Sequence, residues 1–86
     1  MDADEKLARK ALAKLGLPRD VKAYGIELGL DSTGDPALWI WLDVADTHEP
    51  TSAMITRLRK FKNKIYRTLL DEGVSRWPYV RLREAA

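Results

Sequence analysis

The sequence contains no cysteine, a single histidine and no long apolar run, and each absence excludes a class of protein. Without cysteine, neither a disulfide framework nor a cysteine-based zinc finger can form, and the expected location is the reducing cytoplasm. The longest apolar run covers residues 37–42, which is too short to cross a membrane. The acidic start, Met-Asp-Ala-Asp-Glu, does not predict a secretory signal.

Motifs that carry catalysis are also absent. The sequence has no Gly-x-Ser-x-Gly, no glycine-rich phosphate loop and no triad partner for His48. In Asp46-Thr-His48-Glu49 a histidine lies beside carboxylates, which is compatible with a metal or acid–base site, but the same residues suit the entry to a helix. The histidine has no second ligand at motif spacing. We therefore expect no enzyme activity, no metal, no cofactor and no small-molecule substrate.

What is present is typical of one small folded domain covering residues 1–86, with 45% hydrophobic and 33% charged residues. A net charge of +2 is too small to indicate nucleic acid or a membrane as the binding partner, but the charges are segregated along the chain. Residues 23–56 carry six acidic and no basic side chains, whereas residues 57–67 carry six basic and no acidic ones. A nearly neutral total is thus built from an acidic middle and a basic segment.

Hydrophobic periodicity predicts two helices and three strands. Apolar residues recur at helical spacing in two segments, each ended by a glycine, Gly16 or Gly73. Period-two alternation marks three other segments, the first two joined by the turn-rich residues 31–36 as a hairpin. The expected elements are a helix over 3–15, strands over 22–30 and 37–45, a helix over 51–72 and a strand over 78–83.

This order, α-β-β-α-β, predicts a two-layer α+β domain with a three-stranded mixed sheet. A right-handed crossover through the second helix makes the second and third strands parallel. The simplest arrangement places the first strand in the centre, with strand order 2-1-3 and both helices on one face. The element order is similar to that of ring-building-motif and type II KH-like domains at the level of fold alone. The Gly-x-x-Gly loop of KH domains is absent, so no family is assigned.

The most informative feature is the sheet face that the helices leave open. Alternation assigns Trp39, Trp41, Tyr79 and Arg81 to this face and places Trp77 near its rim. A solvated sheet face normally carries small polar and charged residues, whereas tryptophan, tyrosine and arginine are enriched at binding hot spots. The open face is therefore the candidate binding surface.

Three interpretations of this face stay open. The rings could fold over Gly25 and Gly29 and be half-buried within the monomer. They could bind a protein or a second copy of the chain, a homodimer being the commonest case. They could stack the bases of single-stranded RNA, although Glu27 and Asp43 share the face and would repel phosphates.

We expect a small non-catalytic interaction module, of the accessory, antitoxin or inhibitor kind, that binds a protein or itself. The open face would supply the contacts, and the edges of the second and third strands would offer a second route by strand addition. The alternative is a nucleic-acid-binding module that uses the basic stripe of the second helix, Arg57, Lys60, Lys64 and Arg67. That stripe could also be a solvated face, neutralised by nearby acidic residues of the same chain.

Overall fold

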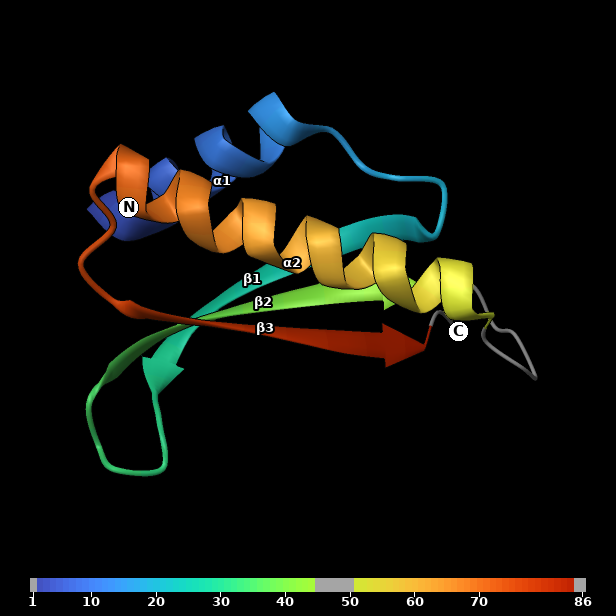
Figure 1. The fold of residues 1–86 in the computed structure, drawn as a ribbon. Coiled ribbons are helices and arrows are strands. Elements are labelled where there is room, and N and C mark those ends of the chain that lie inside the picture. The colour runs from blue at the N-terminus through green and yellow to red at the C-terminus, as the bar shows by residue number, and fades with distance from the viewer. Residues whose placement is uncertain (1, 45–50, 85–86) are drawn as a thin grey trace.

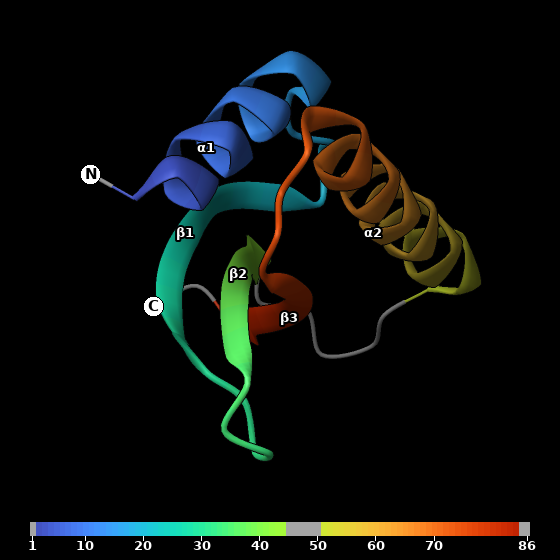
Figure 2. The same ribbon diagram turned by 90° about the vertical axis from the view of Figure 1, so that its left-hand side faces the viewer.

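The computed structural model describes residues 2–44 and 51–84, which form two helices and a three-stranded sheet (Figure 1). The elements are α1 (Ala3–Leu15), β1 (Val21–Leu30), β2 (Pro36–Val44), α2 (Ser52–Glu72) and β3 (Trp77–Glu84). Both helices lie on the same side of the sheet (Figure 2), so the domain has the expected two-layer α+β class and leaves the other face of the sheet open.

Each helix is bounded by capping residues. Helix α1 begins after Asp2, whose carboxylate accepts a hydrogen bond from the backbone N–H of Asp4, 2.8 Å away. Helix α2 begins after Thr51, whose hydroxyl accepts from the backbone of Met54 at 3.1 Å. It ends at Gly73, which adopts the left-handed conformation with φ 84° and allows the next N–H, that of Val74, to reach the carbonyl of Leu69.

The strand order differs from the expected 2-1-3, because β2 and not β1 occupies the centre of the sheet. Strands β1 and β2 pair antiparallel as a hairpin, and β2 and β3 pair parallel. The crossover through α2 therefore returns the chain directly beside β2 instead of skipping a strand. The physical reason lies in β2, which is the most apolar strand and needs neighbours at both edges, since four of its side chains are fully buried: Ala37, Leu38, Ile40 and Leu42. As a consequence β2 is not an edge strand, and the expected strand addition at its edge is wrong.

The hydrophobic core fills the space between the helices and the covered face of the sheet. It combines one stripe from each helix with the inward-facing residues of the strands, namely Ala8, Ala11, Leu12, Val21, Leu38, Ile40, Leu42, Met54, Leu58, Phe61, Ile65, Leu69 and Val80. The alternation of β3 places Leu82 on the same face as the buried Val80, but Leu82 is 46% exposed. It borders an open groove beside α2 instead of completing the core.

The turn that leads from α2 into β3 is fixed by a carboxylate from the other end of the chain. Asp4 is 7% exposed and accepts hydrogen bonds from the backbone N–H and hydroxyl of Ser75 at 3.1 and 2.9 Å, and from the backbone N–H of Arg76 at 2.9 Å. Burial alone would raise the pKa of Asp4, but the hydrogen bonds from Ser75 and Arg76 outweigh it and lower the pKa. The first turn of α1 thereby sets the position at which β3 begins.

Candidate protein-binding surface

Strands β2 and β3 place the aromatic residues of the open face side by side. In the parallel register Trp39 lies opposite Tyr79, and Trp41 lies opposite Arg81. The ring centroids of Trp39 and Tyr79 are 4.7 Å apart with an interplanar angle of 20°, and those of Trp39 and Trp41 are 6.1 Å apart with an angle of 14°. We call this stacked set of Trp39, Trp41 and Tyr79 the aromatic ladder; its rings are half-buried by one another.

Arginine side chains complete the open face. The guanidinium carbon of Arg81 lies 5.4 Å from the ring centroid of Tyr79 and 5.8 Å from that of Trp39, within the range of a cation–π contact. Arg83 lies 5.8 Å from the Trp41 ring and pairs with the Asp43 carboxylate, with N–O distances of 2.5 and 3.3 Å. The exposed rim of the ladder is therefore charged, while the rings beneath it are already stacked.

The two glycines of β1 do not have the common role that the sequence suggested. Gly29 lies beneath Trp39, whose Nε1 is 3.8 Å from the position of an added Cβ. At Gly25 the nearest group is instead Nη2 of Arg83, 3.3 Å from an added Cβ. Gly25 therefore makes room for an arginine that pairs with Asp43, and only Gly29 lies under a tryptophan ring.

Tyr79 anchors the ladder to the loop between β1 and β2. Its hydroxyl donates to Oδ2 of Asp31 at 3.0 Å, and Oδ1 of Asp31 accepts from the backbone N–H groups of Thr33 and Asp35 at 2.9 and 3.0 Å. The hydrogen bond from the Thr33 hydroxyl is the largest of several that together outweigh partial burial and lower the pKa of Asp31 to about 2. The same Asp31 carboxylate raises the pKa of Tyr79. One carboxylate thus orders both the loop and one end of the ladder.

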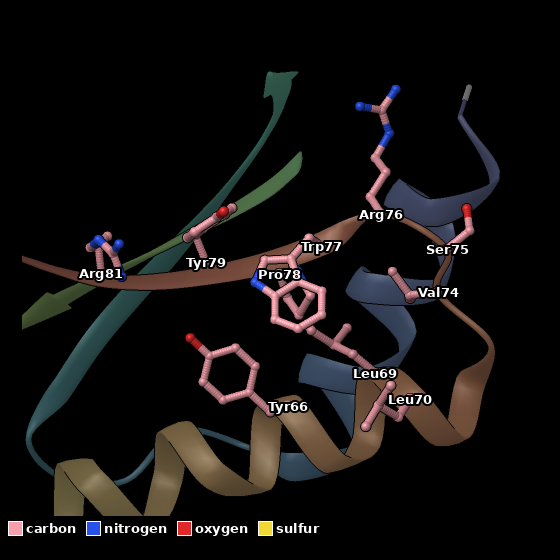
Figure 3. Close-up of a pocket in the computed structure, with 10 residues that line it drawn as sticks. All are labelled: Tyr66, Leu69, Leu70, Val74, Ser75, Arg76, Trp77, Pro78, Tyr79 and Arg81. Carbon is pink, nitrogen blue, oxygen red and sulfur yellow. The ribbon is translucent and has the colours of Figure 1, made fainter. Parts of the chain in front are cut away.

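The other side of β3 borders an apolar groove against α2. The deeper part has a volume of about 750 Å³ and is lined by ten residues: Tyr66, Leu69, Leu70, Val74, Ser75, Arg76, Trp77, Pro78, Tyr79 and Arg81. Figure 3 shows the Trp77 indole between the β3 ribbon and α2, on the same side as Leu69 and Leu70. Trp77 is 66% exposed and Leu70 73% exposed, the largest values among the large apolar side chains in the described part of the chain. A shallower part of about 320 Å³ begins at Tyr66 and reaches Ile55 and Leu82. We call the two parts together the α2–β3 groove.

The five residues expected to form the binding surface therefore separate into two adjoining groups. Trp77, Tyr79 and Arg81 all line the groove, whereas Trp39 and Trp41 belong to the ladder. Tyr79 belongs to both, because it stacks on Trp39 and also borders the groove. Strand β3 is thus the element that joins the open face to the groove.

The groove wall contributed by α2 was missed at the level of sequence. Ile55 and Leu70 are exposed and lie outside the apolar stripe that runs from Met54 to Leu69, and Tyr66 lies at its margin, half-buried against the core. The three form a row at helical spacing, and apolar residues off the main stripe are the sequence signal of a second apolar face.

The basic stripe of the alternative interpretation is incomplete. Arg57 donates from Nε and Nη2 to the Asp20 carboxylate at 2.7 and 3.0 Å, and this contact lowers the pKa of Asp20 and raises that of Arg57. Lys60, Lys64 and Arg67 are exposed and have no carboxylate partner among the described residues. The stripe that remains available to a ligand is therefore these three residues.

The residues weighed as a metal or acid–base cluster, Asp46, His48 and Glu49, lie outside the described residues. Within residues 2–44 and 51–84, no group of three or more histidine, cysteine, aspartate or glutamate side chains is placed to hold a metal ion. No helix in the described part of the chain is both long and apolar enough to cross a membrane.

Comparison with protein-family models, with curated proteins and with solved structures finds no match to the chain.

Proposed function

We propose that this chain is a non-catalytic protein-binding module whose binding surface is built on β3. The observation that carries the proposal is the pair of exposed apolar side chains, Trp77 and Leu70, that border one groove. A tryptophan left two-thirds exposed beside an apolar groove is the kind of residue that carries binding energy in protein interfaces. As part of the same proposal, the absence of cysteine assigns the module to a reducing compartment, the cytoplasm.

The ladder supports the same surface from the other side of β3. Its rings are held by stacking and by the Tyr79–Asp31 hydrogen bond, so ordering them at an interface costs little conformational entropy. Arg81 lies at the junction of ladder and groove and presents donors to a partner carboxylate or carbonyl. A second copy of the chain is the alternative protein partner, docking by the open face, which carries charges of both signs in Arg83 and Asp43.

Site-specific photo-crosslinking in cells tests this proposal. A photoreactive benzoyl-phenylalanine in place of Trp77 should give covalent adducts to protein, because the side chain lies in the groove. The matched control carries the same group in place of Leu30, which is 65% exposed at the end of β1 and does not line the groove.

The mass of the adduct distinguishes the partners. An adduct of twice the chain mass identifies a homodimer, and a heavier or lighter protease-sensitive adduct identifies another protein. A nuclease-sensitive adduct at position 77, or adducts of equal yield at positions 77 and 30, would contradict the proposal.

Nucleic-acid binding is the second candidate function, and a specific observation favours it. Lys60, Lys64 and Arg67 are exposed on α2 without carboxylate partners among the described residues. Three phosphate contacts predict that the logarithm of affinity for duplex DNA falls with the logarithm of salt concentration with a slope of about −2.7. Lys60→Glu with Lys64→Glu should abolish such binding, whereas binding that is insensitive to salt and to these substitutions excludes this candidate.

A further inference from the structure

Helix α2 carries a second face that the domain covers only in part, at Lys62 and Tyr66, and leaves exposed at Ile55, Arg59 and Leu70. Ile55, Arg59, Lys62, Tyr66 and Leu70 follow one another at intervals of three and four residues, so they form a single row along the helix. All five line the α2–β3 groove. The row has apolar residues at its two ends and in its middle, with cations between them, a pattern typical of a helix face that packs against another helix.

The adjoining edge of β3 is closed to strand addition over its first half. Pro78 has no backbone N–H to donate. The N–H of Val80 is directed away from β2 and donates to the hydroxyl of Tyr66 at 3.2 Å, and the carbonyl of Val80 accepts from Nη1 of Arg81 at 3.3 Å. Because backbone groups of alternate residues point to the same side of a strand, Pro78 and Val80 are the two positions that an added strand would need along the deeper part of the groove. Along this first half of the edge, recognition by side chains is therefore favoured over strand addition, which stays a prediction for the second half.

The charges around the groove are of one sign. Among the described residues that line it there are four cations, Arg59, Lys62, Arg76 and Arg81, and no carboxylate. Arg76 is already directed to Asp2 and Asp4, with N–O distances of 3.5 and 4.0 Å. The other three cations have no ion-pair partner among the described residues.

This charge distribution indicates which kind of partner can bind the α2–β3 groove. A two-fold contact of one groove against the groove of a second copy would bring these cations against their own counterparts, which is unfavourable. An acidic partner would instead place carboxylates beside them. The complementary charge is therefore supplied by a different chain, not by a copy of this one.

We propose that the α2–β3 groove binds an acidic amphipathic helix of a partner protein, in the manner of a helix laid into an apolar groove. This inference rests on the proposed protein-binding function and specifies the chemistry of the partner. The row from Ile55 to Leu70 has a length of about 22 Å, which corresponds to about four turns of a docked helix. Apolar residues of the partner at i, i+3 or i+4, and i+7 contact the floor of the groove near Tyr66 and Trp77, and its flanking Asp or Glu residues face Arg59, Lys62 and Arg81.

The probe is a library of random peptides of about 16 residues displayed on phage and selected against the whole immobilised chain. The selected peptides should be acidic, should carry apolar residues at helical spacing and should gain helical circular dichroism on binding. Leu70→Glu should weaken their binding about tenfold or more, because it introduces a repelling charge into the apolar floor. Leu30→Glu, at a residue of similar exposure outside the groove, should leave their binding unchanged.

A pair of charge reversals on the same helix supplies the electrostatic control. Arg59→Glu with Lys62→Glu reverses two groove cations and should weaken binding about fivefold or more. Lys60→Glu with Lys64→Glu is the matched control, because it changes the total charge by the same amount. It should weaken binding much less, since these two cations do not line the groove. Far-ultraviolet circular dichroism of each variant verifies that it is folded.

The outcomes separate the two levels of the proposal. Selected peptides that are basic, that alternate with period two, or that bind Leu70→Glu as well as the natural chain overturn the acidic-helix inference. Peptides that no longer bind the Trp41→Ala variant but still bind the Leu70→Glu variant must contact the ladder. That result would overturn the acidic-helix inference but not the proposed protein-binding function. If no peptide is selected, the inference fails, and if photo-crosslinking at position 77 also gives no protein adduct, the proposed function fails with it.

Discussion

Replacing Asp4 by alanine tests how the start of β3, and with it the proposed binding surface, is held in place. Asp4 is buried and accepts three hydrogen bonds from Ser75 and Arg76. Hydrogen bonds to a charged acceptor contribute about 1.5–3 kcal/mol each, but Ser75 is exposed, so water replaces part of what the substitution removes. We therefore expect Asp4→Ala to lower the free energy of unfolding by about 2–3 kcal/mol, a large part of the total of about 4–13 kcal/mol for a chain of this size.

Urea unfolding followed by circular dichroism measures this loss as a lower midpoint with an unchanged slope. Asp2→Ala is the matched control, because it removes the cap of the same helix and should cost only about 1 kcal/mol. The difference in the free energy of unfolding between the natural chain and Asp4→Ala should depend on pH. The pKa of Asp4 is lower in the folded than in the unfolded chain, so its contribution is complete above the unfolded carboxyl pKa and is lost as the pH falls through the folded pKa.

The stability gap between the natural chain and Asp4→Ala should therefore narrow on acidification below about pH 4. Two results would refute the reasoning. In the first, Asp4→Ala is no less stable than Asp2→Ala. In the second, the gap stays constant through acid pH, which would mean that the carboxylate charge is not what holds Ser75 and Arg76.

Four further predictions concern the ladder and the cap of α2. Because the Asp31 carboxylate raises the pKa of Tyr79, Asp31→Asn should return that pKa toward about 10 in an ultraviolet titration, with Tyr79→Phe identifying the signal. In the natural chain, whose Asp31 pKa is lowered to about 2, the contribution of this carboxylate to stability should persist until the pH falls toward that value. Trp41→Ala should cost about 1–3 kcal/mol in urea unfolding and leave the helical circular dichroism intact, since the ring is half-buried and not part of the core. Gly73→Ala should cost about 1 kcal/mol, because Gly73 has φ 84°, and a result near zero would contradict the left-handed cap.

Periodicity predicted the elements well because it is a local property. The alternation that assigned Trp39, Trp41 and Tyr79 to the open face depends only on the geometry of each strand, and the structure places all three there. The order of the strands depends on how the whole sheet packs beneath the helices. The burial of β2 on the covered face decided it, and no single segment contains that information.

The charge pattern shows the same division between local and tertiary information. The basic stripe of α2 was visible in the sequence, and so was the chance that acidic residues of the same chain neutralise part of it. The neutralising residue is Asp20, which belongs to the connection before β1 and not to the acidic middle of the chain. Pairing of Arg57 with Asp20, 37 positions away, follows from the packing of α2 beside that connection and could not be derived from spacing.

The features from which the acidic-helix partner is proposed also bear on whether the exposed edge of β3 can pair with another sheet. A free strand edge beside exposed leucine and tryptophan is a predicted site of edge-to-edge association. On β3 the first half of that edge is closed by Pro78 and by the Tyr66 and Arg81 contacts to Val80, and cations border the apolar floor. The closed edge opposes pairing with another strand, and the cations oppose contact with a second positively charged groove. Neither opposes the docking of a helix, because the backbone groups of a helix are already paired internally. The residues that oppose edge-to-edge association are therefore the same ones on which the proposed acidic helical partner depends.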